Sequence, residues 1–277
     1  MNSPSAIASP HKLQRAYGQL DIAAHRNNGD VTRLRNLRQQ GSYRAIFPRP
    51  ISGNIEAVMI NTAGGVTGGD RFSTNVTAHD TACISITTQA AERIYRATAP
   101  ATGVVKTMLC AEKDAQLYWL PQETILFDGA RLRRSLDVDL HPTARFLMIE
   151  PLVFGREASG ETLHSGMLDD RVTINRDGQP IYLDRIMLEG DIAASLARPA
   201  VANGARAVAN IVLVDPNLQT LLAGLRDLLP RQAGASLLSE NVLVARILAA
   251  DSYALRCALF PILTLLTNNA VPKNWRL

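Results

Sequence analysis

Five carboxylates of this 277-residue chain occur in apolar or glycine-rich stretches, where an acidic side chain needs a specific partner. They are Asp70, Glu123, Asp128, Glu150 and Glu161. Glu150, for example, directly follows the apolar run 146–149 and precedes a proline. A carboxylate in such surroundings must be ion-paired, hydrogen-bonded, protonated or bound to a metal ion.

Two interpretations of these acids stay open. The chain is rich in arginine, so each acid can form an internal salt bridge, such as Asp70 with Arg71 or Glu161 with Arg156. Alternatively, acids placed along the interior of a β structure can hold a divalent cation weakly and pass it on. A carrier that must release its ion should avoid a closed site of histidines and cysteines, and the sequence shows no such spacing.

The sequence offers little for catalysis. None of the five histidines stands in a metal-binding motif such as His-Glu-x-x-His, and there is no Gly-x-Ser-x-Gly motif around a nucleophilic serine. We therefore expect no catalytic residues and no enzymatic activity.

The densest motif is the segment 61–72 (NTAGGVTGGDRF), in which Gly64, Gly65, Gly68 and Gly69 fall within six positions. Gly64 and Gly69 have the spacing of a phosphate-binding loop, but Asp70 follows where that loop needs lysine. The next residues alternate like a strand and do not open a helix. We expect a structural glycine turn or a partner-facing loop. A nucleotide-binding or hydrolytic enzyme that uses this loop is the alternative.

Composition narrows the class of protein. Hydrophobic residues make up 47% of the chain and aromatic residues only 5%, which predicts a large aliphatic core. No apolar run approaches the roughly 18 residues of a membrane span, and the start lacks the pattern of a secretory signal. We expect a cytoplasmic protein without membrane contact. The arginines are scattered, which argues against nucleic-acid binding.

Residues 55–188 alternate between apolar and polar with a period of two, which predicts many short strands and an all-β body. The stretch 131–140 shows the pattern best, although Arg134 interrupts its apolar face and is expected near a sheet edge. The residues 176–178 (RDG) predict a hairpin turn between two of the last strands.

The pattern changes after Gly190. Asp215 is expected to cap a helix that runs to Pro230, and Asp251 to cap a second helix that Pro261 kinks or interrupts. Residues 241–248 favour one more strand, with a helix as the alternative, and Trp275 is expected to dock on the body. We expect one domain over 1–277, with 1–12 disordered, a β body over 13–190 and a mixed segment with two helices over 191–277.

Four blocks of this sequence resemble the urease accessory protein D (UreD/UreH) family. They are the glycine segment 61–72, 87–96 (TTQAAERIYR), 120–130 (LPQETILFDGA) and 155–161 (GREASGE). The resemblance is strong over residues 40–190. The sequence departs from the family at 89–92, where a Pro-Gly version is common, and at Asn268 and Asn269, where a basic segment is expected.

The resemblance implies a fold and a function. The fold is mainly β, a β-helix-like stack of short strands with two C-terminal helices. The function is that of a non-enzymatic scaffold that binds apo-urease, joins the accessory proteins F and G, and passes nickel towards the urease active site. The cofactor expectation is therefore transient nickel(II) and nothing tightly bound.

The resemblance also suggests sites. The five acids named above would line or support the nickel path, and docking to partners would involve Arg93, Tyr95, Arg96, Leu255 and Leu259. A structural β protein without any metal role is a further alternative.

Overall fold

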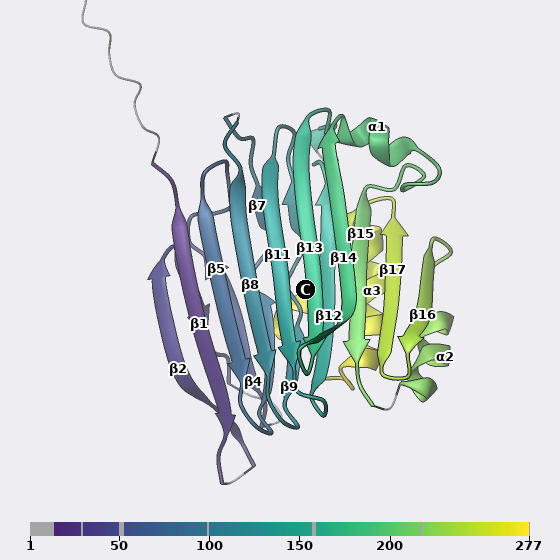
Figure 1. The fold of residues 1–277 in the computed structure, drawn as a ribbon. Coiled ribbons are helices and arrows are strands. Elements are labelled where there is room, and N and C mark those ends of the chain that lie inside the picture. Colours follow the sequence, from purple (N-terminus) through teal and green to yellow (C-terminus); the bar gives the residue numbers. More distant parts are fainter. Residues whose placement is uncertain are drawn as a thin grey trace, which may run out of the picture.

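The computed structural model describes residues 14–28, 30–49, 53–98, 100–156, 159–216 and 218–276. The disorder expected for residues 1–12 concerns a segment outside these residues. Within them, the protein is mainly β, as predicted, and its strands form two sheets that face each other (Figure 1).

In the part of the chain that the structure describes, one sheet has seven strands and the other has ten. The order in the seven-stranded sheet is β14 (Gln179–Gly190), β13 (Gly166–Arg176), β11 (Arg131–Leu140), β8 (Gly103–Ala111), β5 (Arg71–Ala78), β1 (Tyr17–Arg26) and β2 (Thr32–Gly41). The ten-stranded sheet runs β16 (Ala233–Ser239), β17 (Val242–Ala249), β15 (Ala207–Val214), β12 (Arg145–Phe154), β9 (Gln116–Trp119), β6 (Cys83–Thr88), β4 (Ile55–Asn61) and β3 (Tyr43–Ile46). Beside this row, β10 (Thr124–Leu126) pairs with β12, and β7 (Glu92–Ile94) pairs with β10.

The chain winds between the sheets as a parallel coil, which confirms the predicted β-helix-like stack. β5, β8, β11 and β13 are parallel neighbours in one sheet, and β4, β6, β9 and β12 are parallel neighbours in the other. Because the strands stay in register, inward side chains form ladders such as Val76, Leu109, Val138 and Ile174. Each of these buried aliphatic side chains contributes roughly 1.5–3 kcal/mol of transfer free energy to the core.

The predicted hairpin closes one end of the coil. β13 and β14 pair antiparallel, and the turn between them places Asp177 at φ 51° and Gly178 at φ 72°. Two consecutive left-handed residues are what a two-residue turn between right-twisted strands requires, so the sequence Asp-Gly suits this position.

Three helices occur among the described residues: α1 (Ile192–Ala197), α2 (Gln219–Leu228) and α3 (Ser252–Leu266). α1 was not predicted. α3 begins as predicted, since the Asp251 side chain accepts a hydrogen bond from the Ala254 N–H at 2.7 Å, and it continues through Pro261 without interruption. The cap predicted for α2 is wrong. α2 begins at Gln219 with Leu218 at its N-cap position and no side-chain cap, while Asp215 is buried with an oxygen 2.7 Å from Arg145 Nε.

The helices create a second core on the outer face of the ten-stranded sheet. α2 and α3 pack there against strands that include β12, β15 and β17. The Trp275 side chain, in the short 3₁₀ turn Lys273–Trp275, is 1% exposed, and its Nε1–H donates to the Leu120 carbonyl at 2.9 Å. The predicted docking of Trp275 on the body is thus confirmed, and the strand predicted near 241–248 is β17.

Candidate functional site: a polar seam between the two sheets

Arg134 lies in the interior at the middle of the seven-stranded sheet. Its strand, β11, is flanked by β13 and β8, so the prediction that Arg134 lies near an edge is wrong. The residue is 9% exposed and points towards the opposite sheet with the aliphatic side chains of the same strand. A buried guanidinium is stable only where acceptors satisfy its donors.

Arg134 finds those acceptors in both sheets. Its Nε and Nη2 bind Asp170 of β13 in a two-pronged pair at 2.8 and 2.6 Å. Nη2 also reaches Glu150 Oε2 of β12 at 3.1 Å, and Nη1 lies 3.4 Å from the Thr124 hydroxyl. Trp119 donates from Nε1 to the other Glu150 oxygen at 2.8 Å. One guanidinium therefore ties the two sheets together through two buried carboxylates.

Burial and pairing act in opposite directions on these groups. Burial alone would lower the pKa of Arg134, but the charges of Asp170 and Glu150 outweigh it, and the pKa is raised. Burial raises the pKa of Glu150, a shift that Arg134 partly offsets and Asp170 reinforces. Arg134 stays charged, while Glu150 holds its negative charge less firmly than an exposed glutamate does.

Two small cavities meet at this pair. Arg134 and Glu150 line both a cavity of about 60 Å³, on the side of β4 and β7, and one of about 10 Å³, on the side of β14 and β15. A volume of a few tens of Å³ holds one or more water molecules if polar partners are present. Gln122 lines the larger cavity, and its buried Nε2 has no hydrogen-bond partner among the described residues. Such an orphan donor marks a place for water.

Glu92 lines the far end of the larger cavity. The Asn61 amide donates to both of its carboxylate oxygens, at 3.1 and 3.2 Å, and also to the Gly65 carbonyl of the glycine turn. Burial raises the pKa of Glu92 to about 7, although the Asn61 hydrogen bond opposes the shift. The cavity thus ends at an acid that titrates near neutral pH.

Beyond the smaller cavity, polar contacts continue towards the surface. Asp184 of β14 accepts hydrogen bonds from Asn210 of β15 and from Arg246 of β17, and the Arg246 side chain is 47% exposed. We call the residues Glu92, Thr124, Arg134, Glu150, Asp170, Asp184 and Asn210 the polar seam. The seam crosses the space between the sheets from the glycine turn to β17.

The five acids singled out from sequence do not come together. Only Glu150 belongs to the seam. Asp70 accepts hydrogen bonds from the backbone N–H groups of Ala16 and Thr67, both at 2.8 Å, and so fixes the start of β5. Its expected pairing with Arg71 is replaced by these backbone contacts.

The other three acids have arginine partners, as the salt-bridge interpretation expects. Glu123 lies 3.2 Å from Arg256 of α3, and Glu161 lies 3.0 Å from Arg156. Asp128 pairs with Arg96 and accepts from the Ser165 N–H at 2.9 Å. These contacts hold loops and the helical layer in place.

Sequence reasoning missed Asp170, Asp184 and the role of Glu92, and it placed Arg134 at an edge. The available signal was an ionisable residue on the apolar face of an alternating strand: Arg134 in β11 and Asp170 in β13 face each other in register. Across the described residues, no three His, Cys, Asp or Glu side chains are close enough to hold a metal ion together. The seam is therefore a line of separate acids and not a preformed metal site.

The glycine segment is a structural turn. Gly64, Gly65 and Gly69 have positive φ, and a Cβ on Gly65 would lie 2.4 Å from the Tyr95 ring and 2.5 Å from the Arg93 carbonyl. Several N–H groups of the loop already donate to backbone carbonyls, for example Gly64 to Asn61 and Gly69 to Thr102. The loop is therefore not arranged to cradle phosphate, which needs free N–H groups.

The proposed docking residues divide into two groups. Arg93, Tyr95 and Arg96 are exposed beside the glycine turn, where the Tyr95 ring packs edge-on against Phe127 and its hydroxyl donates to the Gly64 carbonyl. Leu255 and Leu259 are 0% and 1% exposed and face the core under α3, so they are not on the surface of this structure. The exposed side chains of α3 include Tyr253 and Phe260 instead.

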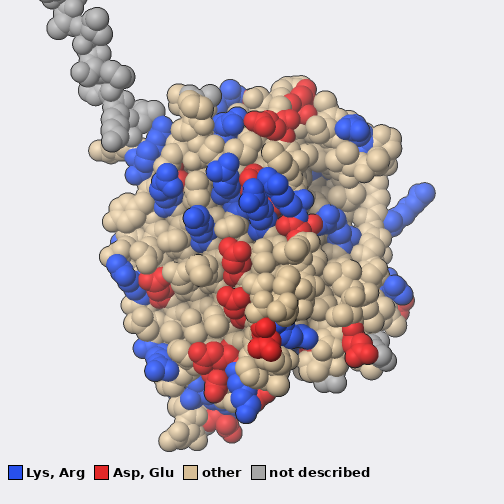
Figure 2. All heavy atoms as spheres, viewed as in Figure 1, with Lys and Arg blue, Asp and Glu red and all other residues tan. Residues whose placement is uncertain are grey.

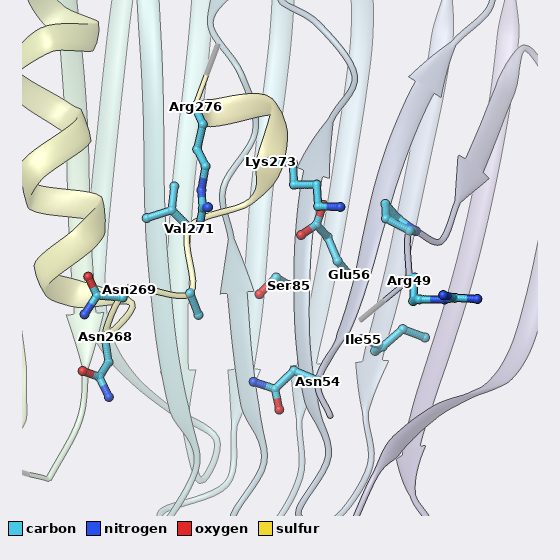
Figure 3. Close-up of a pocket in the computed structure, with 12 residues that line it drawn as sticks. Arg49, Asn54, Ile55, Glu56, Ser85, Asn268, Asn269, Val271, Lys273 and Arg276 are labelled. Atoms are coloured by element: carbon cyan, nitrogen blue, oxygen red, sulfur yellow. The ribbon is translucent and has the colours of Figure 1, made fainter. Parts of the chain in front are cut away.

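A separate hollow of about 190 Å³ lies on the outer face of the ten-stranded sheet, where the C-terminal segment crosses β4 and β6 (Figure 3). Its lining includes Arg49, Lys273 and Arg276 together with Glu56. Burial raises the pKa of Glu56, and Lys273 and Arg276 oppose that shift. The carboxylate already balances part of the positive charge, so the hollow is a weaker candidate site than the seam. Asn268 and Asn269 also line it.

In the described part of the chain, no helix is long and apolar enough to cross a membrane.

Comparison with known proteins places the chain in a family. The model of the family described as UreD urease accessory protein matches residues 16–276. A urease accessory protein UreD from Roseobacter denitrificans is 47% identical over 272 residues, which cover 98% of each chain. One from Ruegeria pomeroyi is 49% identical over 89% of this chain and 96% of its own, and one from Rhizobium rhizogenes is 43% identical over 99% and 100%. The chain belongs to the UreD family of urease accessory proteins.

Proposed function

We propose that this chain is a non-enzymatic urease maturation factor. It binds apo-urease, joins the accessory proteins F and G, and helps nickel to reach the urease active site by way of the polar seam. Family membership supports the role in urease maturation, since the relatives are named urease accessory proteins. The passage of nickel rests on the geometry of the seam.

The observation that carries the proposal is the surplus of acids in the seam. Among the described residues, Glu150 and Asp170 share the guanidinium of Arg134, Asp184 pairs with the half-exposed Arg246, and Glu92 accepts hydrogen bonds from the neutral Asn61 amide. Burial raises the pKa of Glu92 and of Glu150, so these two acids readily hold a proton, and an entering cation can take the place of that proton. Carboxylate and water ligands bind nickel less tightly than imidazole or thiolate ligands do, so the ion can move on.

Arg134 must move for an ion to pass, because it occupies the junction of the two cavities. Its two-pronged pair with Asp170 is shorter than its contact with Glu150, so the weaker contact breaks first. Glu150 would then face the larger cavity with an oxygen free for the cation. We infer that the isolated chain is in a closed state and that partner binding opens the junction.

The test uses co-expression of this chain with the urease subunits and the other accessory proteins. In Glu150→Gln the side chain keeps its shape and one acceptor oxygen but loses its charge, and its new NH2 group replaces the oxygen that accepts from Trp119 or from Arg134. We expect less nickel per urease and a lower urease activity, several-fold in each case, with unchanged recovery of the chain in the complex. Glu161→Gln is the matched control, because it also neutralises an arginine-paired acid but lies outside the seam. Equal nickel loading in both variants would contradict the path.

A further inference from the structure

The outer face of the seven-stranded sheet carries three arginines that converge on one carboxylate. Arg171 Nη2 lies 3.1 Å from an oxygen of Asp169, Arg185 Nε lies 2.9 Å from the other oxygen, and Arg133 Nε lies 3.4 Å from the first. The Asp169 side chain is 6% exposed, while those of the three arginines are 46–60% exposed. The aspartate is buried beneath a cover of guanidinium groups.

Two more cations continue this cluster across the sheet. Lys106 of β8 shares a cross-strand row with Arg171 and Arg185, and Arg71 of β5 shares the row of Arg133 and Asp169. Figure 2 shows lysine and arginine gathered in a band across this face. We call Arg71, Lys106, Arg133, Arg171 and Arg185 the basic patch. With Asp169 included, the patch carries as much positive charge as the whole chain, whose net charge is +4.

Electrostatic repulsion between the clustered cations of the basic patch destabilises the seven-stranded sheet. Arg171 and Arg185 are direct cross-strand partners, and like charges directly opposite each other destabilise a sheet. Asp169 offsets part of the repulsion. Burial would raise its pKa, but hydrogen bonds from Arg185 and Arg171 lower it, so it stays ionised. One carboxylate cannot neutralise three guanidinium groups, so the patch keeps a surplus of positive charge on half-exposed side chains that can donate to external carboxylates.

Exposed apolar side chains flank the patch. Leu183 and Met187 lie on either side of Arg185 on the same face of β14 and are 68% and 58% exposed. Met108 of β8, next to Lys106 on that face, is 56% exposed. Arginine and methionine are enriched in protein–protein interfaces, where apolar contact surrounds a few charge-assisted hydrogen bonds.

The charged and apolar side chains on the outer face of the seven-stranded sheet favour one kind of binding partner over others. A second copy of the chain would bring like charges together in a symmetric contact, which costs free energy. A nucleic-acid backbone would match the charge of the patch but offers no apolar partner to the exposed side chains of Leu183, Met187 and Met108. An acidic protein surface with apolar residues among its carboxylates matches both the positive charge of the patch and the exposed apolar side chains beside it.

We propose that the basic patch, together with Leu183 and Met187, docks an acidic and partly apolar protein surface of the urease machinery. This inference rests on the proposed function for the identity of the partner. The chemistry of recognition follows from the face itself.

The direct test measures binding of labelled peptides to the purified full chain by fluorescence anisotropy. The probes are a peptide of alternating glutamate and leucine, one of alternating glutamate and serine, an oligothymidine of equal charge, and vesicles that contain phosphatidylserine. We expect the glutamate–leucine peptide to bind best. The double variant Arg71→Glu/Lys106→Glu should weaken its binding ~10-fold or more, because charge reversal turns attraction into repulsion.

The matched control is Arg33→Glu/Arg35→Glu on the edge strand β2, which changes the net charge equally at exposed positions outside the patch. Leu183→Ser/Met187→Ser tests the apolar part and should remove the preference for the leucine peptide. Equal weakening in patch and control variants, or tighter binding of the oligonucleotide or the vesicles than of the peptide, would overturn the proposal.

A second readout separates this proposal from the proposed function. In co-expression with the urease machinery, the patch variant should reduce recovery of the chain with its partners, whereas Glu150→Gln should reduce nickel delivery at normal recovery. If Glu150→Gln behaves as expected and the patch variant assembles normally, the docking proposal fails and the nickel path stands. If the patch variant loses assembly and Glu150→Gln has no effect, the docking proposal stands and the nickel path fails.

Discussion

Glu123 and Arg256 join the β coil to the last helix across 133 positions of sequence, with Oε1 3.2 Å from Nη1. Arg256 also donates to the Gln122 side chain at 2.8 Å and to the Asn274 carbonyl at 2.9 Å, and its guanidinium lies 5.1 Å from the centre of the Trp275 ring. This single arginine holds a strand connection, α3 and the C-terminal turn in one cluster.

The first prediction concerns that cluster. Arg256→Met keeps much of the side-chain volume but leaves Glu123 and the Asn274 carbonyl without their donor. We expect a loss of about 1–3 kcal/mol in the free energy of unfolding, measured by urea denaturation. Glu123→Gln should cost less, because the amide can still accept from Arg256. If Glu123→Gln instead left stability unchanged but abolished nickel delivery, Glu123 would belong to the path after all.

The second prediction concerns the junction of the seam. Arg134→Met leaves Asp170 and Glu150 buried without their cation, which typically costs about 3–5 kcal/mol. Without the guanidinium the pKa of Glu150 should rise further, so the variant should lose stability as the pH increases. Adding Glu150→Gln should restore part of the lost stability, most clearly at high pH. Additive losses in the double variant would show that the two residues do not interact.

The third prediction concerns Glu92. Its pKa in the folded state is about 7, above the ordinary value of 4.5, so the folded protein holds this proton more tightly than the unfolded chain does. The folding free energy therefore becomes less favourable as the pH rises from about 4.5 to about 7, by at most about 3 kcal/mol. Glu92→Gln should flatten this part of the stability profile and be more stable than the parent protein above pH 7. An unchanged profile would show that Glu92 ionises like an exposed acid.

The fourth prediction tests the glycine turn with a matched pair of variants. Gly65→Ala places a methyl group 2.4 Å from the Tyr95 ring and 2.5 Å from a carbonyl oxygen, at φ 151°. Gly64→Ala has φ 78° but meets nothing within 4 Å. We expect about 1 kcal/mol of destabilisation for Gly64→Ala and clearly more for Gly65→Ala, by thermal or urea unfolding. Similar losses would mean that both the Tyr95 ring and the Arg93 carbonyl move aside without cost.

The sequence was sufficient to predict strands, the β13–β14 hairpin and the cap of α3, because each depends on local chemistry. Alternation, an Asp-Gly turn and an N-terminal aspartate act over a few residues. The predicted cap of α2 is wrong because the helix begins four residues after Asp215, at Gln219, while Asp215 is an ion-pair partner of Arg145, 70 positions earlier, and no local pattern encodes such a long-range contact.

The seam could not be predicted from sequence, because it too depends on contacts between residues far apart in the chain. Whether Arg134 stands at an edge or in the middle of a sheet depends on which strands flank β11, and no local pattern encodes that. Of the five acids chosen for their surroundings, four lie outside the seam and stabilise loops or the helical layer through backbone N–H groups or arginines. These are Asp70, Glu123, Asp128 and Glu161. Strand register would have added Asp170, since it lies directly beside Arg134, but register is known only once the coil is known.

The parallel coil has a consequence for how disturbances spread through the molecule. The contacts within aliphatic ladders such as Val76–Leu109–Val138–Ile174 are non-directional. A packing change at one position can therefore be absorbed by its neighbours without shifting distant turns of the coil. The Arg134 cluster is directional and reaches across both layers, from β13 through β11 to β12. A small sideways shift of one sheet relative to the other would break the Arg134 hydrogen bonds before it disturbed the aliphatic contacts around them. The Arg134 cluster therefore couples the positions of coil turns that are otherwise independent.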